Sequence, residues 1–385
     1  AFKRFQKNSD YSKFLENNEY WLDDFALFMA LKVKNGFSSF DTWEKDERRR
    51  DTLSDEKIAA LQNECDFWRF LQFEFFRELT ALKDYAKSKN VALIGDIPIY
   101  VAYDSADVWA HPEIFRLDKN MRPKEVAGVP PDYFSADGQL WGNPLYDWKK
   151  QQADGFLWWH HRLLHQLQFF DKIRIDHFRA FESYYAVPYG ATTAKIGRWV
   201  KGVGTKIFDG LDLDGRIIAE DLGIITDKVR RLVKRTGFPG MKVFQFAFDG
   251  KSDNEHLPEN VRYNTVYYTG THDNDTLKGW YDAQGDGTKE YVKKTLGATD
   301  ENVFDKAFKR VMRSRAKFVI VPMQDYLLQG SEARMNTPGT NDGNWKYVLP
   351  KNYAKVKNRI RKYVKNRCSN SAARTALLKS HHCKQ

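Results

Sequence analysis

The sequence is poor in cysteine and has no long apolar stretch, and both absences narrow the class of protein. Only three of its 385 residues are cysteines, Cys65, Cys368 and Cys383, and they form no CxxC pair and no zinc-ligand spacing. An odd number of cysteines without a disulfide framework favours a reducing compartment. No apolar run approaches the length of a membrane-spanning helix. We therefore expect a cytoplasmic protein without a membrane partner, with a plastid location left open.

The sequence also lacks the motifs that would explain its positive charge. Lys and Arg number 62 against 51 Asp and Glu, a net charge of +11, and such an excess suggests nucleic acids or anionic surfaces as partners. The basic residues gather in the short run 48–50 and in the segment 351–384, without any RNA- or DNA-binding signature. We interpret them as a solvated helix face or a tail, and we predict no nucleic-acid partner.

Aromatic residues are in excess. They make up 15% of the chain, with 11 Trp, 19 Tyr and 27 Phe. Such a content suits stacking against the apolar faces of sugar rings, and it equally suits an aromatic-rich core. The length exceeds the roughly 250 residues of a plain (β/α)8 barrel, so the chain has room for one large domain or for two ordinary ones.

Short apolar runs bounded by turn residues indicate an α/β protein. Residues 1–90 read as helical throughout, and helical patterns recur at 226–235 and 300–315. Strand, helix and strand in alternation predict a parallel sheet. No Gly-rich phosphate loop follows the first run, which argues against a nucleotide-binding sheet. The six expected strands are the runs 91–100, 172–178, 216–220, 241–248, 265–270 and 318–322.

A (β/α)8 TIM barrel closes with eight strands, whereas this sequence offers six. We therefore expect an N-terminally truncated barrel that lacks its first two strands, and an open sheet is the alternative. In this interpretation residues 1–90 are a helical segment packing on the barrel, and residues 91–350 form the catalytic barrel. Residues 104–150 are an aromatic insertion over its mouth, and residues 351–385 are a basic C-terminal helix and tail.

The run 172–178 carries the most informative pattern. Read with a period of two, Ile173 and Ile175 point one way, while Arg174, Asp176 and Phe178 point the other. A guanidinium beside a carboxylate favours the ionised carboxylate, which is what a nucleophile at a sugar carbon must be. An ion pair at a strand end without any catalytic role is the alternative interpretation.

Acidic residues recur where the predicted strands end, and this is the active face of a barrel. Breaking a glycosidic bond takes one ionised and one protonated carboxyl group. Glu220 ends an apolar strand, where partial desolvation would raise its pKa and keep it protonated. His272 and Asp273 follow another strand and could hold adjacent sugar hydroxyls. With Asp96 and Asp176, these positions favour an enzyme that acts on sugars.

The segments RIDHF (174–178), AEDLG (219–223) and THDND (271–275) resemble the catalytic strand ends of the α-amylase clan. The resemblance is closest to the 4-α-glucanotransferases called amylomaltase or disproportionating enzyme, glycoside hydrolase family 77. It covers about residues 20–350 and includes GDIPIYVAYDSADVWAHPEIF (95–115), VAGVPPDYFSADGQLWGNPLYDW (126–148), RIDHFRAFESYYAVP (174–188), GRWVKGVG (197–204), AEDLGIITDKV (219–229), GFPGMKVFQFAFD (237–249), YTGTHDNDT (268–276) and GSEARMNTPG (330–339).

The resemblance implies a role for each matching residue. Asp176 would be the nucleophile, Glu220 the general acid/base, and Asp273 the carboxylate that stabilises the transition state. Two carboxyl groups about 5 Å apart would retain the α-linkage. The implied substrate-binding residues are Arg174, His177 and His272 in the cleaved subsite, Asp96, Trp141 and Asn336 in neighbouring subsites, and Tyr133 and Phe134 in a mobile loop.

We therefore expect a cofactor-free and metal-free enzyme that moves α-1,4-glucan segments from a malto-oligosaccharide or starch chain to the 4-hydroxyl of glucose or another glucan. A retaining α-glucosidase or amylase of the same clan is the enzymatic alternative. Because a complete barrel cannot form from this chain alone, an inactive glucan-binding fragment is the third hypothesis.

Overall fold

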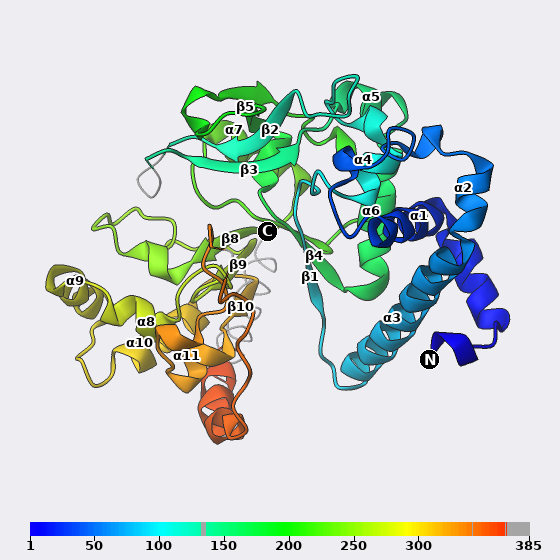
Figure 1. The fold of residues 1–385 in the computed structure, drawn as a ribbon. Helices are drawn as coiled ribbons and strands as arrows, with labels where there is room; N and C mark the ends of the chain where they lie inside the picture. Colours follow the sequence, from blue (N-terminus) through cyan, green and yellow to red (C-terminus); the bar gives the residue numbers. More distant parts are fainter. Residues whose placement is uncertain (132–135, 341, 366, 368–385) are drawn as a thin grey trace, which may run out of the picture. The chain divides into compact units, whose positions relative to one another are not determined.

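The protein is described by a computed structural model, which covers residues 1–131, 136–340, 342–365 and 367 (Figure 1). The chain divides into two compact units, with the division between Gly237 and Phe238. Each unit contains its own three-stranded parallel sheet. The α/β class expected from the sequence is therefore confirmed.

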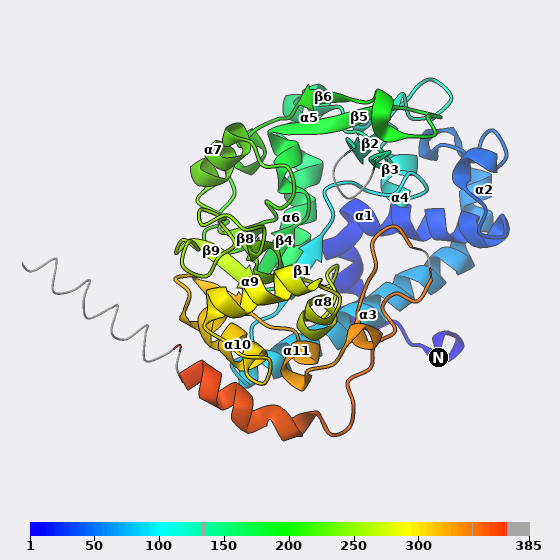
Figure 2. The ribbon, with the colours of Figure 1, turned by 90° about the vertical axis from the view of Figure 1, so that its left-hand side faces the viewer.

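Two long helices dominate the first 90 residues. The side chain of Asn8 accepts a hydrogen bond from the backbone of Tyr11 and so caps the first helix, which ends before the left-handed Gly36. The two helices pack side by side through aromatic rings, such as Tyr11 against Phe73 at 5.3 Å (Figure 1, Figure 2). Between residues 35 and 54 the chain forms only short 3-10 helices and turns, so the prediction of helix throughout was wrong for that stretch. The helices are α1 (Ser9–Lys34), α2 (Asp55–Ala60) and α3 (Gln62–Ser88).

The parallel sheet of the first unit carries most of the predicted catalytic positions. Its strands are β1 (Ile94–Ile97), β4 (Lys172–Ile175) and β7 (Ile217–Ala219), in the order β1-β4-β7. Asp96 lies opposite Arg174, and Arg174 lies opposite Ile218. Helix α6 (Leu157–Phe169) leads into β4, and α7 (Asp227–Thr236) follows β7.

The aromatic insertion contains ordered strands that its irregular sequence did not predict. Two of them pair with two strands formed after residue 182, which were not predicted either, into an antiparallel sheet of order β3-β2-β5-β6 (Figure 2). Gly128 is required here, because a Cβ atom would lie 2.4 Å from the backbone oxygen of Gln139. The elements are α4 (Ala106–Ala110), β2 (Glu125–Val129), β3 (Gln139–Pro144), α5 (Trp148–Ala153), β5 (Ser183–Pro188) and β6 (Arg198–Lys201).

The second unit builds its own core around three parallel strands in the order β10-β9-β8. Buried Phe244, Tyr267 and Phe308 lie at the centre of this core. The predicted strand 241–248 ends early, because Phe244–Ala247 forms a 3-10 helix. The elements are β8 (Gly240–Val243), β9 (Thr265–Tyr268), α8 (Leu277–Asp282), α9 (Asp286–Leu296), α10 (Val303–Arg313), β10 (Phe318–Ile320), α11 (Met323–Leu327) and a helix at 357–365.

All six predicted strands are present in shortened form, and they pair in parallel within each unit. The helical patterns at 226–235 and 300–315 correspond to α7 and α10. Within the described part of the chain, no helix combines the length and the apolar character needed to cross a membrane.

Candidate active site

Asp176 is the first residue after β4, and the chain turns sharply behind it. The prediction that the strand continues to Phe178 was wrong, because β4 ends at Ile175 and His177 adopts a left-handed conformation with φ of 52°. Phe178 then begins a buried 3-10 turn instead of sharing the face of Arg174. This turn leaves the carboxylate of Asp176 at the carboxyl end of the strand.

Arg174 connects two carboxylates at this edge of the sheet. Its guanidinium forms an ion pair with Asp96 on the neighbouring strand and a 2.5 Å contact with Asp176 Oδ1. Burial acts to lower the pKa of Arg174, but the negative charges of Asp176 and Asp96 raise it overall. A permanently charged and buried guanidinium therefore holds both partly exposed carboxylates in place.

Glu220 follows β7 and is only 9% exposed. Its Oε2 atom accepts a hydrogen bond from the backbone nitrogen of His177, and its Oε1 atom accepts one from that of Leu222, both at 2.8 Å. Burial, with the negative charge of Asp176, raises the pKa of Glu220 to about 7, although Arg174 and the two backbone donors act against the shift. The side chain therefore retains a proton up to near-neutral pH, as its sequence context predicted.

An indole ring stands beside His177. The rings of Trp141, on β3, and His177 are 4.8 Å apart and nearly perpendicular. Burial first, and then the positive charge of Arg179, lower the pKa of His177 to about 3. The imidazole is therefore neutral at pH 7 and can donate or accept a hydrogen bond. An exposed aromatic face next to a neutral imidazole suits a sugar ring.

The second unit holds the other predicted carboxylate, Asp273, in the loop that follows β9. The Asn336 side-chain amide donates a 2.6 Å hydrogen bond to Asp273 Oδ1, and His272 Nε2 lies 3.3 Å from Asp273 Oδ2. The backbone nitrogen of Asn336 also donates to the carbonyl oxygen of His272 at 3.1 Å. The three predicted residues therefore form one cluster.

Two further residues support this cluster and were missed in the sequence. Arg334 donates to the backbone oxygens of Asp273, at 2.7 Å, and Asn336, at 2.9 Å. The ring of Trp345 lies 5.2 Å from that of His272. Arg334 stands in the segment 330–339 that carried the family resemblance, so a signal for it was present. No pattern marks Trp345, because its contact depends on a loop.

Asp325 is a third residue that the sequence did not single out. It is buried, and it accepts hydrogen bonds from Thr269 Oγ1 at 2.5 Å and from the backbone nitrogen of Leu277 at 2.7 Å. Burial raises the pKa of Asp325 to about 6. Because Thr269 and Leu277 flank the loop that contains Asp273, Asp325 fixes both ends of that loop.

The predicted residues fall into two clusters, one in each unit. Tyr133 and Phe134 lie outside the described residues. Among the described residues, no three His, Cys, Asp or Glu side chains are close enough to hold a metal ion. The first cluster contains Asp96, Trp141, Arg174, Asp176, His177 and Glu220, and the second contains His272, Asp273 and Asn336.

The first cluster has the parts that cleavage of a glycosidic bond requires. Asp176 is a fixed carboxylate at the strand end, and Glu220 is a buried acid whose pKa lies near neutral pH. An enzyme can use such a pair as nucleophile and proton donor on opposite sides of an anomeric carbon.

Comparisons with known proteins agree with this chemistry. A sequence model of the family described as 4-alpha-glucanotransferase (glycoside hydrolase family 77) matches residues 1–352. The chain is 47% identical to a 4-alpha-glucanotransferase of Clostridium butyricum over 356 residues, covering 90% of this chain and 73% of that relative. It is 44% identical to one of Aquifex aeolicus, covering 94% of this chain and 76% of the relative.

A solved structure gives the same result for the fold. The amylomaltase of Streptococcus agalactiae in complex with acarbose superposes with a TM-score of 0.86 at 35% sequence identity. The superposition covers 92% of this chain and 73% of that structure. This chain therefore belongs to the 4-α-glucanotransferases of glycoside hydrolase family 77 and has their α/β fold.

Proposed function

We propose that this protein transfers α-1,4-glucan segments from a malto-oligosaccharide or starch chain to the 4-hydroxyl of glucose or of another glucan. The single observation that carries the proposal is the buried Glu220, with its pKa near 7, beside the strand end that holds Asp176. Family membership identifies the reaction, and this pair supplies the chemistry for it.

The reaction proceeds in two displacements that together retain the α-linkage. In the first, Asp176 attacks the anomeric carbon, the glycosidic bond breaks, and Glu220 gives its proton to the departing oxygen. In the second, the Glu220 carboxylate takes the proton of the acceptor hydroxyl, whose oxygen displaces Asp176 from the sugar. One residue serves first as acid and then as base, so a pKa near neutral pH suits both steps.

Asp273 is proposed as the carboxylate that stabilises positive charge on the sugar ring in the transition state. Asn336 and His272 contact its two oxygens and so fix its orientation. Preorganised groups of this kind stabilise developing charge without any reorganisation during the reaction. His272 and Asn336 are themselves proposed to contact the sugar.

Substrate binding in the first unit is assigned to four side chains. Arg174 and His177 are proposed to hold the glucose unit whose bond is cleaved, and Asp96 and Trp141 to contact its neighbours. The Trp141 ring, placed against His177, offers the apolar face on which a sugar ring can stack. Tyr133 and Phe134 are proposed as part of a loop over the site, on the family resemblance alone.

We also propose that the six parallel strands belong to a (β/α)8 barrel with its active face at the strand ends that carry Asp96, Asp176, Glu220 and Asp273. Residues 91–350 would form the catalytic part, residues 1–90 a helical segment packed on it, and the residues from 351 onward a basic extension. The two parallel triads and the helices between their strands support this arrangement.

Maltotriose distinguishes transfer from hydrolysis. The protein should convert it into glucose together with a ladder of longer maltodextrins, and labelled glucose added as acceptor should appear in the ladder. Glucose and maltose without longer products would support a hydrolase of the same clan. The Asp176→Ala variant, which removes the proposed nucleophile, should form no ladder, and an unchanged ladder would contradict that assignment.

A further inference from the structure

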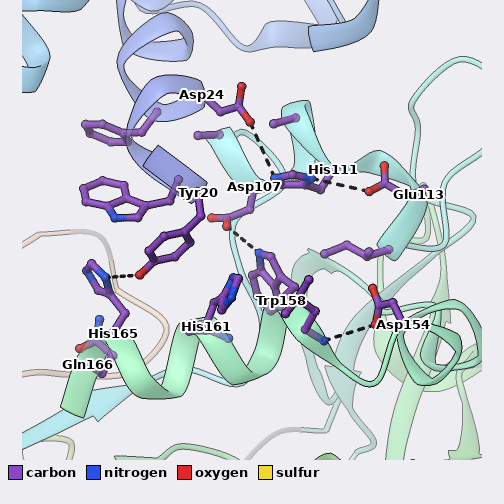
Figure 3. Close-up of a pocket in the computed structure, with 17 residues that line it drawn as sticks. Tyr20, Asp24, Asp107, His111, Glu113, Asp154, Trp158, His161, His165 and Gln166 are labelled. Atoms are coloured by element: carbon purple, nitrogen blue, oxygen red, sulfur yellow. Dashed lines mark hydrogen bonds and ion pairs between the residues drawn. The ribbon is translucent and has the colours of Figure 1, made fainter. Parts of the chain in front are cut away.

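The first unit contains a cavity of about 510 Å³ lined by residues of α1, α4 and α6 and of the loops next to them (Figure 3). This volume lies within the roughly 300–1,000 Å³ of typical small-molecule sites. No proposed catalytic or substrate-binding residue lines it. The cavity is therefore distinct from the candidate active site.

Two aromatic rings of the cavity are held in fixed positions (Figure 3). The Tyr20 hydroxyl lies 2.8 Å from His165 Nδ1, so a contact between α1 and α6 orients its ring, which is 40% exposed. The indole nitrogen of Trp158 donates to Asp107 Oδ1 at 3.0 Å. Arg162 also lines the cavity, and its guanidinium lies 5.3 Å from a Trp158 ring centre. Rigid aromatic faces bind flat apolar surfaces with little loss of conformational entropy.

The polar groups of the cavity include both donors and acceptors. The His161 ring nitrogens and the Gln166 side-chain amide form no hydrogen bond with any part of the chain that the structure describes. Both face the cavity, and each offers a donor and an acceptor. Asp107 and Glu113 add carboxylate acceptors. A ligand with hydroxyl groups, each of which can donate and accept, satisfies such a mixed set.

The charge of the lining disfavours anions. Four carboxylates, those of Asp24, Asp107, Glu113 and Asp154, line the cavity together with the guanidinium of Arg162 and the imidazole of His111. The contact with Glu113 raises the pKa of His111, and Asp24 also pairs with Arg50 at 2.8 Å, yet the negative groups remain in excess. Phosphorylated ligands would be repelled by this excess. A simple cation would find carboxylates and aromatic rings, but it would leave the donors of His161 and Gln166 without acceptors. A neutral ligand with one apolar face and several hydroxyl groups fits all of these features.

We propose that this cavity is a second glucan-binding site, which holds a short stretch of an α-glucan away from the bond that reacts. The identity of the sugar rests on the proposed function. The site is also connected to the catalytic strands, because Arg162 donates to the backbone oxygens of Pro98, at 2.6 Å, and Ile99, at 3.1 Å, directly after the strand that carries Asp96.

A second binding site raises the effective concentration of a glucan at the active site, but only when the glucan is long enough to reach both sites. Long glucans should therefore depend on the cavity, and maltotriose should not. Removing a central aromatic or hydrogen-bonding anchor commonly weakens binding by about fivefold or more. We expect Tyr20→Ala, and separately a His161→Ala/Gln166→Ala double variant, to raise KM for amylose by about that factor while KM for maltotriose changes less than about twofold.

Tyr85→Ala is the matched control, because Tyr85 is 63% exposed on α3 and does not line the cavity. It should change neither KM. The double variant breaks no hydrogen bond among the described residues, so it tests the site even if Tyr20→Ala disturbs folding. Thermal unfolding of each variant identifies such a disturbance.

Calorimetric titration with maltoheptaose tests binding directly. On a Glu220→Gln background, which slows turnover, the protein should show two binding events, and either cavity variant should remove one. Two unchanged binding events with an unchanged KM for amylose would overturn the proposal. Failure of the proposed function would differ, since it would appear as absence of transfer from maltotriose in a protein whose cavity still binds maltoheptaose.

Discussion

The backbone nitrogen of His177 donates a 2.8 Å hydrogen bond to Oε2 of Glu220. The residue directly after Asp176 therefore positions the carboxyl group of the proposed acid. Because β4 and β7 are hydrogen-bonded neighbours, the strand pairing fixes the distance between the two proposed catalytic positions. The sheet itself thus aligns the proposed nucleophile and the proposed proton donor.

Replacing Glu220 by Gln should remove proton transfer while leaving the fold intact. General acid catalysis typically contributes about 10²–10⁴-fold in rate, so kcat for maltotriose should fall within this range. A substrate with a good leaving group, such as α-glucosyl fluoride, needs no proton in the first step and should lose less. Glu16→Gln, an exposed position on α1, is the control. An equal loss with both substrates would contradict the role of Glu220 as acid.

The raised pKa of Glu220 also predicts how stability depends on pH. Between the usual glutamate pKa of about 4.5 and the folded value of about 7, the folded protein holds a proton that the unfolded chain has lost. Stability should therefore fall as pH rises through this window. Relative to Glu220→Gln, the wild type should lose about 1–3 kcal/mol between pH 4.5 and pH 8, measured by urea unfolding. If the difference in unfolding free energy between the two proteins stayed constant with pH, the raised pKa of Glu220 would be refuted.

Arg334 is expected to position the loop that carries Asp273. Its two hydrogen bonds to the backbone oxygens of Asp273 and Asn336 need the forked guanidinium, and lysine cannot make both in the same geometry. Displacing a group that contacts the reacting atoms by about 1 Å can lower the reaction rate by about 10²-fold. We expect Arg334→Ala to lower kcat by about 10–100-fold with a smaller change in KM, and Arg334→Lys to restore part of it.

The control for this experiment is Arg262→Ala, because Arg262 is exposed in the same unit and lies outside the cluster. A purely structural role for Arg334 would lower the melting temperature and the amount of active protein without changing kcat per active molecule. Active-site titration therefore separates the two roles.

Gly202 should tolerate no side chain. A Cβ atom there would lie 2.3 Å from the backbone oxygen of Phe181 and 2.4 Å from that of Ala180. Both belong to the 3-10 turn that follows His177. We expect Gly202→Ala to destabilise the protein by about 1–3 kcal/mol. Gly287→Ala in α9 meets no atom within 4 Å and should be neutral or stabilise by up to about 1 kcal/mol. Urea unfolding of both variants checks the contrast.

The sequence predicts the six parallel strands because each is a short, buried apolar run between turn residues. It fails for β5 and β6, because β5 pairs with β2 in the insertion and β6 pairs with β5, so no local pattern marks them. It also fails after Val243, where a 3-10 helix begins although Phe244 is still apolar, and after Ile175, where the left-handed backbone of His177 ends the strand.

The site was predictable to different extents in its different parts. Arg174 and Asp176 are two residues apart at the end of a predicted strand, so a period of two places them on one face. Asp273 was indicated by its position after a predicted strand, whereas Asn336, 63 residues away, was indicated only by the family resemblance. Neither periodicity nor the family resemblance indicated Asp325. Its hydrogen bonds to Thr269 and Leu277 hold the ends of the loop that carries Asp273, and its own neighbouring sequence contains no unusual pattern.

The left-handed backbone of His177 limits which residues can replace it. Asparagine and glycine accept this conformation readily, whereas valine, isoleucine and threonine resist it. Asparagine at 177 would thus delete the imidazole and keep the amide that holds Glu220, while a β-branched residue would disturb both at once. Few amino acids can therefore replace His177 in an attempt to change sugar specificity, because the backbone conformation, and not the ligand, limits the substitutions.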